Sequence, residues 1–211
     1  GEQPLAKVAV AVKAFPTPGK PRGITSSVAW MFAYHFLTWP DFPDSYGKLG
    51  FNTVGSHYSY DKNVPQQVRE DILNTCREKG YKILCIGSPF AGIRNLVEGN
   101  STGPDGRPLA LATNDGCPAY RGQTYQTSLN QIEDAVAWMR PDIVHLDIEC
   151  YATGAFRGKT GGCHRCSAAA KRLGKPVGEA IVDLGTEHMQ DVKRLIARVC
   201  KRQGFAVPEL G

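Results

Sequence analysis

The chain has 211 residues, 42% of them hydrophobic and 21% charged, a balance that excludes wholesale disorder and suffices for the core of one domain. Its net charge of +5 arises from 25 basic and 20 acidic residues scattered along the sequence, without the dense basic stripe of a nucleic-acid binder. No apolar run reaches the roughly 18–20 residues of a membrane helix. We therefore predict a single domain over residues 1–211 whose partners are neither nucleic acids nor membranes.

The predicted elements alternate between strands, identified from short β-branched or apolar runs, and helices, identified from apolar residues that recur every three or four positions. In chain order they are a strand at residues 5–15, a helix at 24–39, a strand at 51–58, a helix at 65–79, a strand at 81–87, a helix at 128–140 that begins with a capping box at Ser128, a strand at 142–150, a helix capped by Thr186 and ended by Gly204, and a strand at 205–208. A glycine- and proline-rich segment, residues 88–125, precedes the helix at 128–140. Loops of that length in compact domains are usually either functional or disordered.

This alternation predicts an α/β protein with a parallel sheet, because each helix returns the chain to the same edge of the sheet. Both an open doubly wound sheet and part of a (β/α)8 barrel fit the order of elements. The residues after the first strand contain no glycine-rich phosphate-binding turn, and the long loops follow strands, where a barrel builds its active site. We therefore expect a (β/α)8 TIM-type barrel, of which this chain holds the first four βα units and a fifth strand. Because a whole barrel takes about 250 residues, a further segment or subunit is expected to complete it.

The fourth predicted strand carries the strongest chemical signal of the sequence. Side chains alternate between the two faces of a strand, so His145, Asp147 and Glu149 share one face and Val144 and Leu146 share the other. In a barrel the polar set points inward and ends at the carboxyl end of the strand, where barrel enzymes place catalysis. Two carboxylates held close together allow one of them to act as a proton donor at neutral pH. The alternative is a polar cluster that serves only the structure.

Two families of (β/α)8 glycoside hydrolases resemble this part of the chain. Glu149 resembles the acid/base glutamate of retaining barrels, and Cys163-x-x-Cys166 with the alanines after it is similar to the segment that follows that glutamate in family 42 β-galactosidases; Ile148 stands where that family has asparagine. The pattern D-x-x-H-x-D-x-E over residues 142–149 resembles the D-x-x-D-x-D-x-E strand of family 18 chitinases, with histidine in place of the second aspartate.

Both resemblances imply cleavage of O-glycosidic bonds in an oligo- or polysaccharide, with no cofactor needed for catalysis. Glu149 would protonate the leaving oxygen and then activate water. The family 42 resemblance implies a second carboxylate as nucleophile from a later strand, a position that Glu209 does not match. The family 18 resemblance implies that the acetamido group of the substrate acts as nucleophile, positioned by Asp147. A non-catalytic carbohydrate-binding barrel is the alternative function.

Aromatic and polar residues near the ends of the second and fourth strands are candidates for contacts with sugar. Aromatic faces stack on the C–H surface of sugar rings while nearby polar groups bind the hydroxyls. The candidate substrate-binding residues are His57, Tyr58, Tyr60, His145 and Tyr151. Packing of these side chains on the rim of the barrel is an equally good interpretation.

Four of the seven cysteines are candidates for a structural metal site. Cys163 and Cys166 form a C-x-x-C pair, a spacing that lets two thiolates bind one Zn²⁺, although a redox pair or a disulfide has the same pattern. The family 42 resemblance implies a structural zinc held by these two residues with Cys117 and Cys150. A disulfide among Cys117, Cys163 and Cys166 is the alternative, and His164 is a substitute ligand for Cys150.

The other three cysteines, Cys76, Cys85 and Cys200, lie on apolar faces and are predicted as core residues. Because a disulfide would indicate an oxidising compartment and zinc would not, the sequence leaves the compartment open between cytoplasmic and secreted, with the balance toward secreted.

Overall fold

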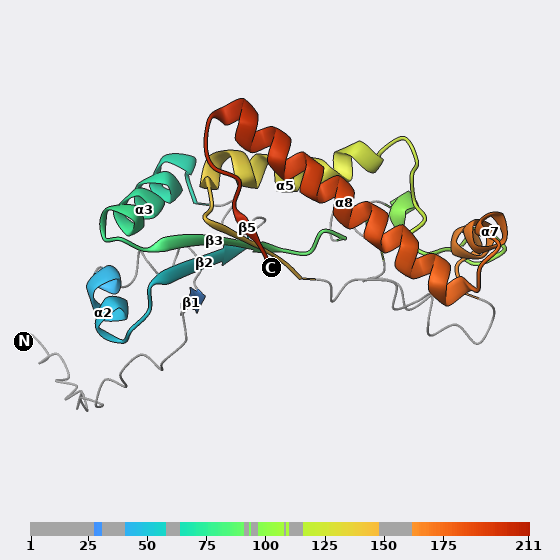
Figure 1. Cartoon of the computed structure of the whole chain (residues 1–211), viewed down its shortest axis with the longest axis horizontal. Helices are drawn as coiled ribbons and strands as arrows, with labels where there is room; N and C mark the ends of the chain where they lie inside the picture. The colour runs from blue at the N-terminus through green and yellow to red at the C-terminus, as the bar shows by residue number, and fades with distance from the viewer. Residues whose placement is uncertain are drawn as a thin grey trace, which may run out of the picture.

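A computed structural model of the chain describes residues 28–30, 41–57, 64–90, 93, 97–107, 109, 116–147 and 162–211, and the structural statements below concern these residues. Strands and helices alternate through most of this part of the chain (Figure 1). In chain order the elements are β1 (Val28–Trp30), α2 (Phe42–Lys48), β2 (Thr53–His57), α3 (Gln66–Glu78), β3 (Lys82–Gly87), the short 3₁₀ helix η1 (Val97–Gly99), α5 (Tyr125–Met139), β4 (Ile143–Leu146), α7 (His164–Leu173), α8 (Val177–Gln203) and β5 (Glu209–Leu210).

The five strands form one parallel sheet whose order follows the chain, β1-β2-β3-β4-β5. One register row runs through Gly55, Leu84, Ile143 and Glu209. In a doubly wound sheet the strand order reverses at the point where ligands bind, whereas barrel strands pair in sequence. The described strands therefore form an open, TIM-like α/β sheet with β1 and β5 at its edges, and they do not show closure into a barrel.

Helices α3, α5 and α8 cover one face of the sheet (Figure 1). We call the buried apolar layer between them the sheet core. Its strand members are Val54, Ile83, Cys85 and Val144, and its helical members include Leu73, Cys76, Ile132, Val136, Met139, Leu195, Ile196, Val199 and Cys200. The three cysteines that the sequence places on apolar faces are all buried free thiols in this layer.

A second buried cluster lies beside the first and is smaller. It consists of Phe90, Ile93, Cys117, Tyr120, Cys163, Cys166 and Ile181, and we call it the cysteine lobe. Its members come from the segment after β3, from the start of α7 and from the N-terminal part of α8. Helix α8 passes from the neighbourhood of α7 to the sheet, so it contributes to both clusters (Figure 1).

Helix α8 is longer than its predicted boundaries. It begins at Val177, whereas the sequence predicts an N-cap at Thr186. Pro176 occupies the N-cap position and Glu179 lies in the first turn, where its charge complements the helix dipole. The hydroxyl of Thr186 donates to the carbonyl of Val182 at 2.8 Å, as a threonine inside a helix does. The predicted start was therefore wrong.

Other boundaries also differ from prediction. Val28–Trp30 forms β1 inside the segment predicted as the helix 24–39, because parallel pairing with β2 decides the conformation of an apolar run without clear periodicity. Helix α5 begins at Tyr125, one turn before the predicted capping box at Ser128. Strand β5 begins at Glu209, after the predicted residues 205–208. The predicted first strand, residues 5–15, lies outside the described residues.

Two helix ends contrast in their use of the left-handed conformation. Helix α8 ends at Gly204 with φ 74°, which costs glycine little. Helix α5 ends at Arg140 with φ 44°, and Arg140 is the only described residue other than glycine with a positive φ.

None of the helices in the described part of the chain combines the length and the apolar character that a membrane span requires.

Candidate functional site

The carboxyl end of β4 is held on both sides by backbone hydrogen bonds. The amide of Asp147 donates to the carbonyl of Gly87, at the end of β3, at 3.0 Å. The amide of Leu146 donates to the carbonyl of Gly211, after β5, at 2.9 Å. Asp147 is half-buried and His145 is exposed. These bonds fix the backbone of the β4 end between the ends of β3 and β5.

The other end of β4 is fixed by a side chain. The carboxylate of Asp142 accepts a hydrogen bond from the amide of Ile83 at 2.8 Å, and the amide of Asp142 donates to the carbonyl of Ile83 at 2.8 Å. Asp142 therefore locks the register of β4 against β3. Its place at the amino end of the strand gives it a structural role, although it opens the D-x-x-H-x-D-x-E pattern.

Positions 57, 145 and 147 lie at the same edge of the sheet. In the register of the strands, Ile86 pairs with His57 on one side and with His145 on the other. Val144 faces the helices within the sheet core, while His145 lies on the opposite face, as alternation predicts. The remaining predicted residues of this site, Tyr58, Tyr60, Glu149 and Tyr151, lie outside the described residues.

Three of the four predicted metal ligands meet in the cysteine lobe. The Sγ of Cys117 lies 3.4 Å from that of Cys163 and 3.8 Å from that of Cys166, and all three sulfurs lie within 4.8 Å of one another. All three residues are fully buried free thiols. A tetrahedral Zn²⁺ with Zn–S bonds of about 2.3 Å holds its sulfurs about 3.8 Å apart, whereas a disulfide brings two sulfurs to about 2.05 Å. The spacing fits a metal ion and does not fit a disulfide.

Backbone contacts between two distant segments bring the thiols together. The amide of Cys117 donates to the carbonyl of Gly99 at 2.8 Å. Cys163 is the N-cap residue of α7, and Cys166 lies in its first turn. The amide of His164 donates to the carbonyl of Thr102 at 2.9 Å, which joins the start of α7 to the segment after β3. The positive end of the helix dipole favours thiolates at this position.

The three thiols perturb one another. Hydrogen bonds from Cys117 and Cys166 lower the pKa of Cys163, whereas hydrogen bonding to Cys163 raises the pKa of Cys117 to about 11. The pKa of Cys166 is also raised, by its contacts with Cys117 and Cys163 and by burial. A cation bound among them would favour the thiolate form of all three.

The described residues supply three ligands to this cluster and no fourth. The Nδ1 of His164 lies 2.8 Å from the Oγ1 of Thr102, and His164 is not among the residues that gather around the sulfurs. The structure therefore does not use His164 as the substitute ligand. Cys150, the fourth predicted ligand, lies outside the described residues.

The sequence analysis missed a buried polar network between the cysteine lobe and the sheet core. His188, on α8, is fully buried and lies 2.8 Å through its Nε2 from the carbonyl of Pro89. Its Nδ1 lies 2.7 Å from the hydroxyl of Tyr125, which is 2.9 Å from the carboxylate of Asp191. The sequence could have indicated the burial of His188, because it lies four residues from both Leu184 and Val192 and so falls on the apolar face of α8.

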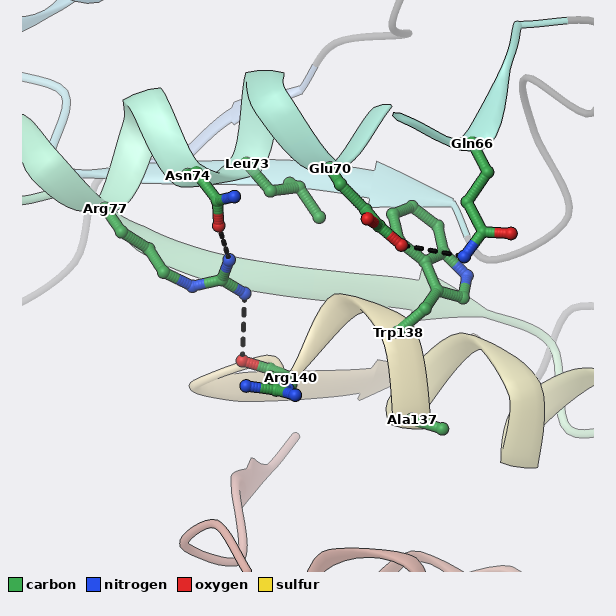
Figure 2. Close-up of a pocket in the computed structure, with 8 residues that line it drawn as sticks. All are labelled: Gln66, Glu70, Leu73, Asn74, Arg77, Ala137, Trp138 and Arg140. Atoms are coloured by element: carbon green, nitrogen blue, oxygen red, sulfur yellow. Dashed lines mark hydrogen bonds between the residues drawn. The ribbon is translucent and has the colours of Figure 1, made fainter. Parts of the chain in front are cut away.

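A cavity of about 400 Å³ opens between α3 and α5, on the helical side of the sheet (Figure 2). Arg77 crosses it and donates hydrogen bonds to Asn74 and to the carbonyls of Met139 and Arg140 at the end of α5. The guanidinium therefore caps the carboxyl end of a neighbouring helix. This cavity lies away from the β4 site and has a structural explanation.

Comparison with known proteins informs the fold alone. No family model and no curated protein matches the chain. Among solved structures, a β-N-acetylhexosaminidase matches over 90% of this chain with a TM-score of 0.50 and 12% sequence identity. This chain covers 47% of that structure, so it spans about half of its length. The likeness shows a glycoside hydrolase-like fold and does not support family 42 in particular.

Proposed function

We propose that the chain carries the acid/base site of a glycoside hydrolase at the carboxyl end of β4. The proposal is supported by the position of His145 and Asp147 at the carboxyl end of β4, where His145 lies on the sheet face opposite the helices. Barrel enzymes build their sites at this end of the sheet. Glu149 follows Asp147 by two positions, the spacing that gives side chains on one face of an extended strand.

The substrate that we propose is a glycoside with a 2-acetamido group. The similarity to a β-N-acetylhexosaminidase and the D-x-E spacing of Asp147 and Glu149 both support this choice. Glu149 would donate its proton to the leaving oxygen while the acetamido oxygen attacks C1, and Asp147 would orient the acetamido N–H. The Glu149 carboxylate would then take a proton from the water that opens the cyclic intermediate. This route uses two carboxylates from one strand.

Hydrolysis of two chromogenic substrates tests the proposal. We expect the chain to cleave p-nitrophenyl N-acetyl-β-glucosaminide and not the β-galactoside. The substitution Glu149→Gln should lower kcat by a factor of about 100 or more, because the proton donor is lost. Asp147→Asn should also lower kcat for the N-acetyl-β-glucosaminide, because the carboxylate that orients the acetamido group is lost. Glu133→Gln is the matched control, because Glu133 pairs with Arg202 at 2.8 Å on the helical side.

Two outcomes would contradict the proposal in different ways. Faster cleavage of the β-galactoside would contradict the acetamido nucleophile, because that substrate has no acetamido group. It would favour a carboxylate nucleophile, as in family 42. Binding of N-acetylhexosamine without turnover by the unsubstituted chain would favour the carbohydrate-binding barrel.

We infer further that Cys117, Cys163 and Cys166 hold a structural Zn²⁺, with Cys150 as the fourth ligand. The sulfur spacing and complete burial support this inference. Thiolates that fill the coordination sphere leave no position for substrate, so the ion would hold the start of α7 against the segment after β3.

Elemental analysis tests the metal directly. About one zinc per chain is expected, and Cys166→Ala should abolish it. Cys85→Ala is the control, since it removes an equally buried thiol from the sheet core. Metal-free protein with a disulfide at Cys163 or Cys166 would overturn the inference. It would favour the alternative, a disulfide among Cys117, Cys163 and Cys166.

A further inference from the structure

Two hydrogen bonds of the ring nitrogens fix the tautomer of neutral His188. The carbonyl of Pro89 can only accept, so the Nε2 of His188 carries the hydrogen of the neutral ring. Its Nδ1 is then an acceptor, as is the carboxylate of Asp191. The single hydroxyl hydrogen of Tyr125 faces both acceptors, at 2.7 and 2.9 Å.

The surroundings of the ring disfavour an imidazolium. His188 is fully buried, and its ring lies 4.7 Å from that of Phe90 and 5.6 Å from that of Tyr125, measured between centroids. The guanidinium of Arg121 lies 4.6 Å from the Tyr125 ring and adds a positive charge on that side. A charged group without a direct counter-ion is costly to bury.

The nearby carboxylates are already paired. Asp191 binds Arg194 at 2.6 Å, and Glu187 binds Arg121 at 3.4 Å. The segment Ser88–Phe90 contributes a carbonyl and an aromatic ring to the network and no ionisable side chain. On protonation the new Nδ1–H would have the Tyr125 hydroxyl as its acceptor, but the charge would stay buried and the carboxylate of Asp191 would reach it only through that hydroxyl.

We propose that His188 is an acid-sensitive latch, which in its neutral form holds the segment Ser88–Phe90 against α5 and α8 and on protonation releases it. The segment follows β3, whose last residue, Gly87, accepts the backbone hydrogen bond of Asp147. His188 is thus a positioning residue for the β4 site. That consequence rests on the proposed function, whereas the latch itself does not.

The direction of the effect follows from linkage. Burial lowers the pKa of His188 to about 4, against 6.5 for an exposed imidazole. A state in which His188 meets water binds a proton more tightly than the latched state, so acid favours release. With these pKa values the equilibrium for release rises about 30-fold between pH 7.5 and pH 5.0 and is nearly constant above pH 7.5.

Hydrogen–deuterium exchange on the full chain tests the latch without any sugar. After correction for the intrinsic effect of pH on exchange, protection of the peptide over residues 84–90 should fall about 30-fold from pH 7.5 to pH 5.0. Protection of α3 should not change by that factor. An equal response of the two peptides, or no response of either, would overturn the proposal.

Two variants assign the effect to His188. In His188→Gln the amide still donates to Pro89 but does not titrate, so the peptide should lose its pH response. His164→Gln is the matched control, because His164 is exposed and its substitution should leave the response intact. A response that persists in His188→Gln, or disappears in His164→Gln, would refute the assignment. If His188→Gln does not fold, loss of protection at pH 7.5 in Tyr125→Phe supports the network, and unchanged protection contradicts it.

Discussion

The sheet core and the cysteine lobe both exclude water, but different kinds of sequence build them. The sheet core takes its side chains from regular elements, at alternate positions of β2, β3 and β4 and at helical spacing in α3, α5 and α8. The cysteine lobe takes its side chains from the segment after β3 and from helix starts, with three thiols at its centre. Apolar burial suffices for the first, whereas the second is small enough that we expect it to need an ion.

The largest expected effect separates the two regions by their dependence on metal. With free zinc about a thousand times above its dissociation constant, binding stabilises the folded chain by about 4 kcal/mol, which a chelator should remove. Urea unfolding with and without chelator measures this difference. Exchange should rise first in α7 and later in α5. An equal rise in both helices would mean that the lobe and the core unfold as one unit.

The next effect should be independent of metal. Ile83→Ala leaves a cavity in the sheet core, where Ile83 is fully buried, and should cost about 3 kcal/mol. The same loss is expected with and without chelator. Val182→Ala is the control, because Val182 is 58% exposed on α8 and should change stability by less than about 0.5 kcal/mol.

A smaller effect concerns a polar contact between α3 and α5. Arg77→Met removes the donor that α3 supplies to the carbonyls of Met139 and Arg140, so it should cost about 2 kcal/mol in denaturant unfolding. Arg198→Met on the exposed side of α8 should cost less than about 0.5 kcal/mol. Equal costs would show that the cap contributes nothing beyond the loss of a surface arginine.

The smallest effect has the opposite sign. Arg140→Gly should stabilise the chain by about 1 kcal/mol, because glycine accepts the left-handed conformation at the end of α5 without its steric cost. Arg140→Ala keeps the Cβ and removes the charge, so it should not stabilise. A gain in both variants would assign the effect to charge, and thermal melts of the two proteins distinguish these results.

The elements with clear periodicity were predicted well. Helix α3 runs from Gln66 to Glu78 against a predicted 65–79, and β3 runs from Lys82 to Gly87 against 81–87. In both, several apolar side chains in register with one face leave little choice of conformation. Val28–Trp30 has no such pattern, and only pairing with β2 makes it a strand. Apolar residues at helical spacing, Ala180, Ile181 and Leu184, precede Thr186 in α8. Gly178 and Gly185 weaken this signal, because glycine is unfavourable inside a helix.

The candidate sites were predictable to different degrees. Alternation along one strand suffices to place His145 and Asp147 on one face, because that rule is local. The meeting of Cys117 with Cys163 depends on a fold that joins residues 46 positions apart, and only the family resemblance suggested it. His188 was missed because a histidine on an apolar face shows its role only through partners such as Pro89, 99 positions away.

Helix α8 is long enough to connect the two regions, and it sets both the distance and the rotation between them. Its 27 residues span about 40 Å, with Ile181 fixed in the cysteine lobe and Val192 in the sheet core. Each residue of a helix turns the chain by about 100°, so one residue inserted between these two points would rotate the lobe by about a quarter of a turn relative to the sheet. The phase of this helix, and not only its length, therefore determines how the lobe is oriented relative to the sheet.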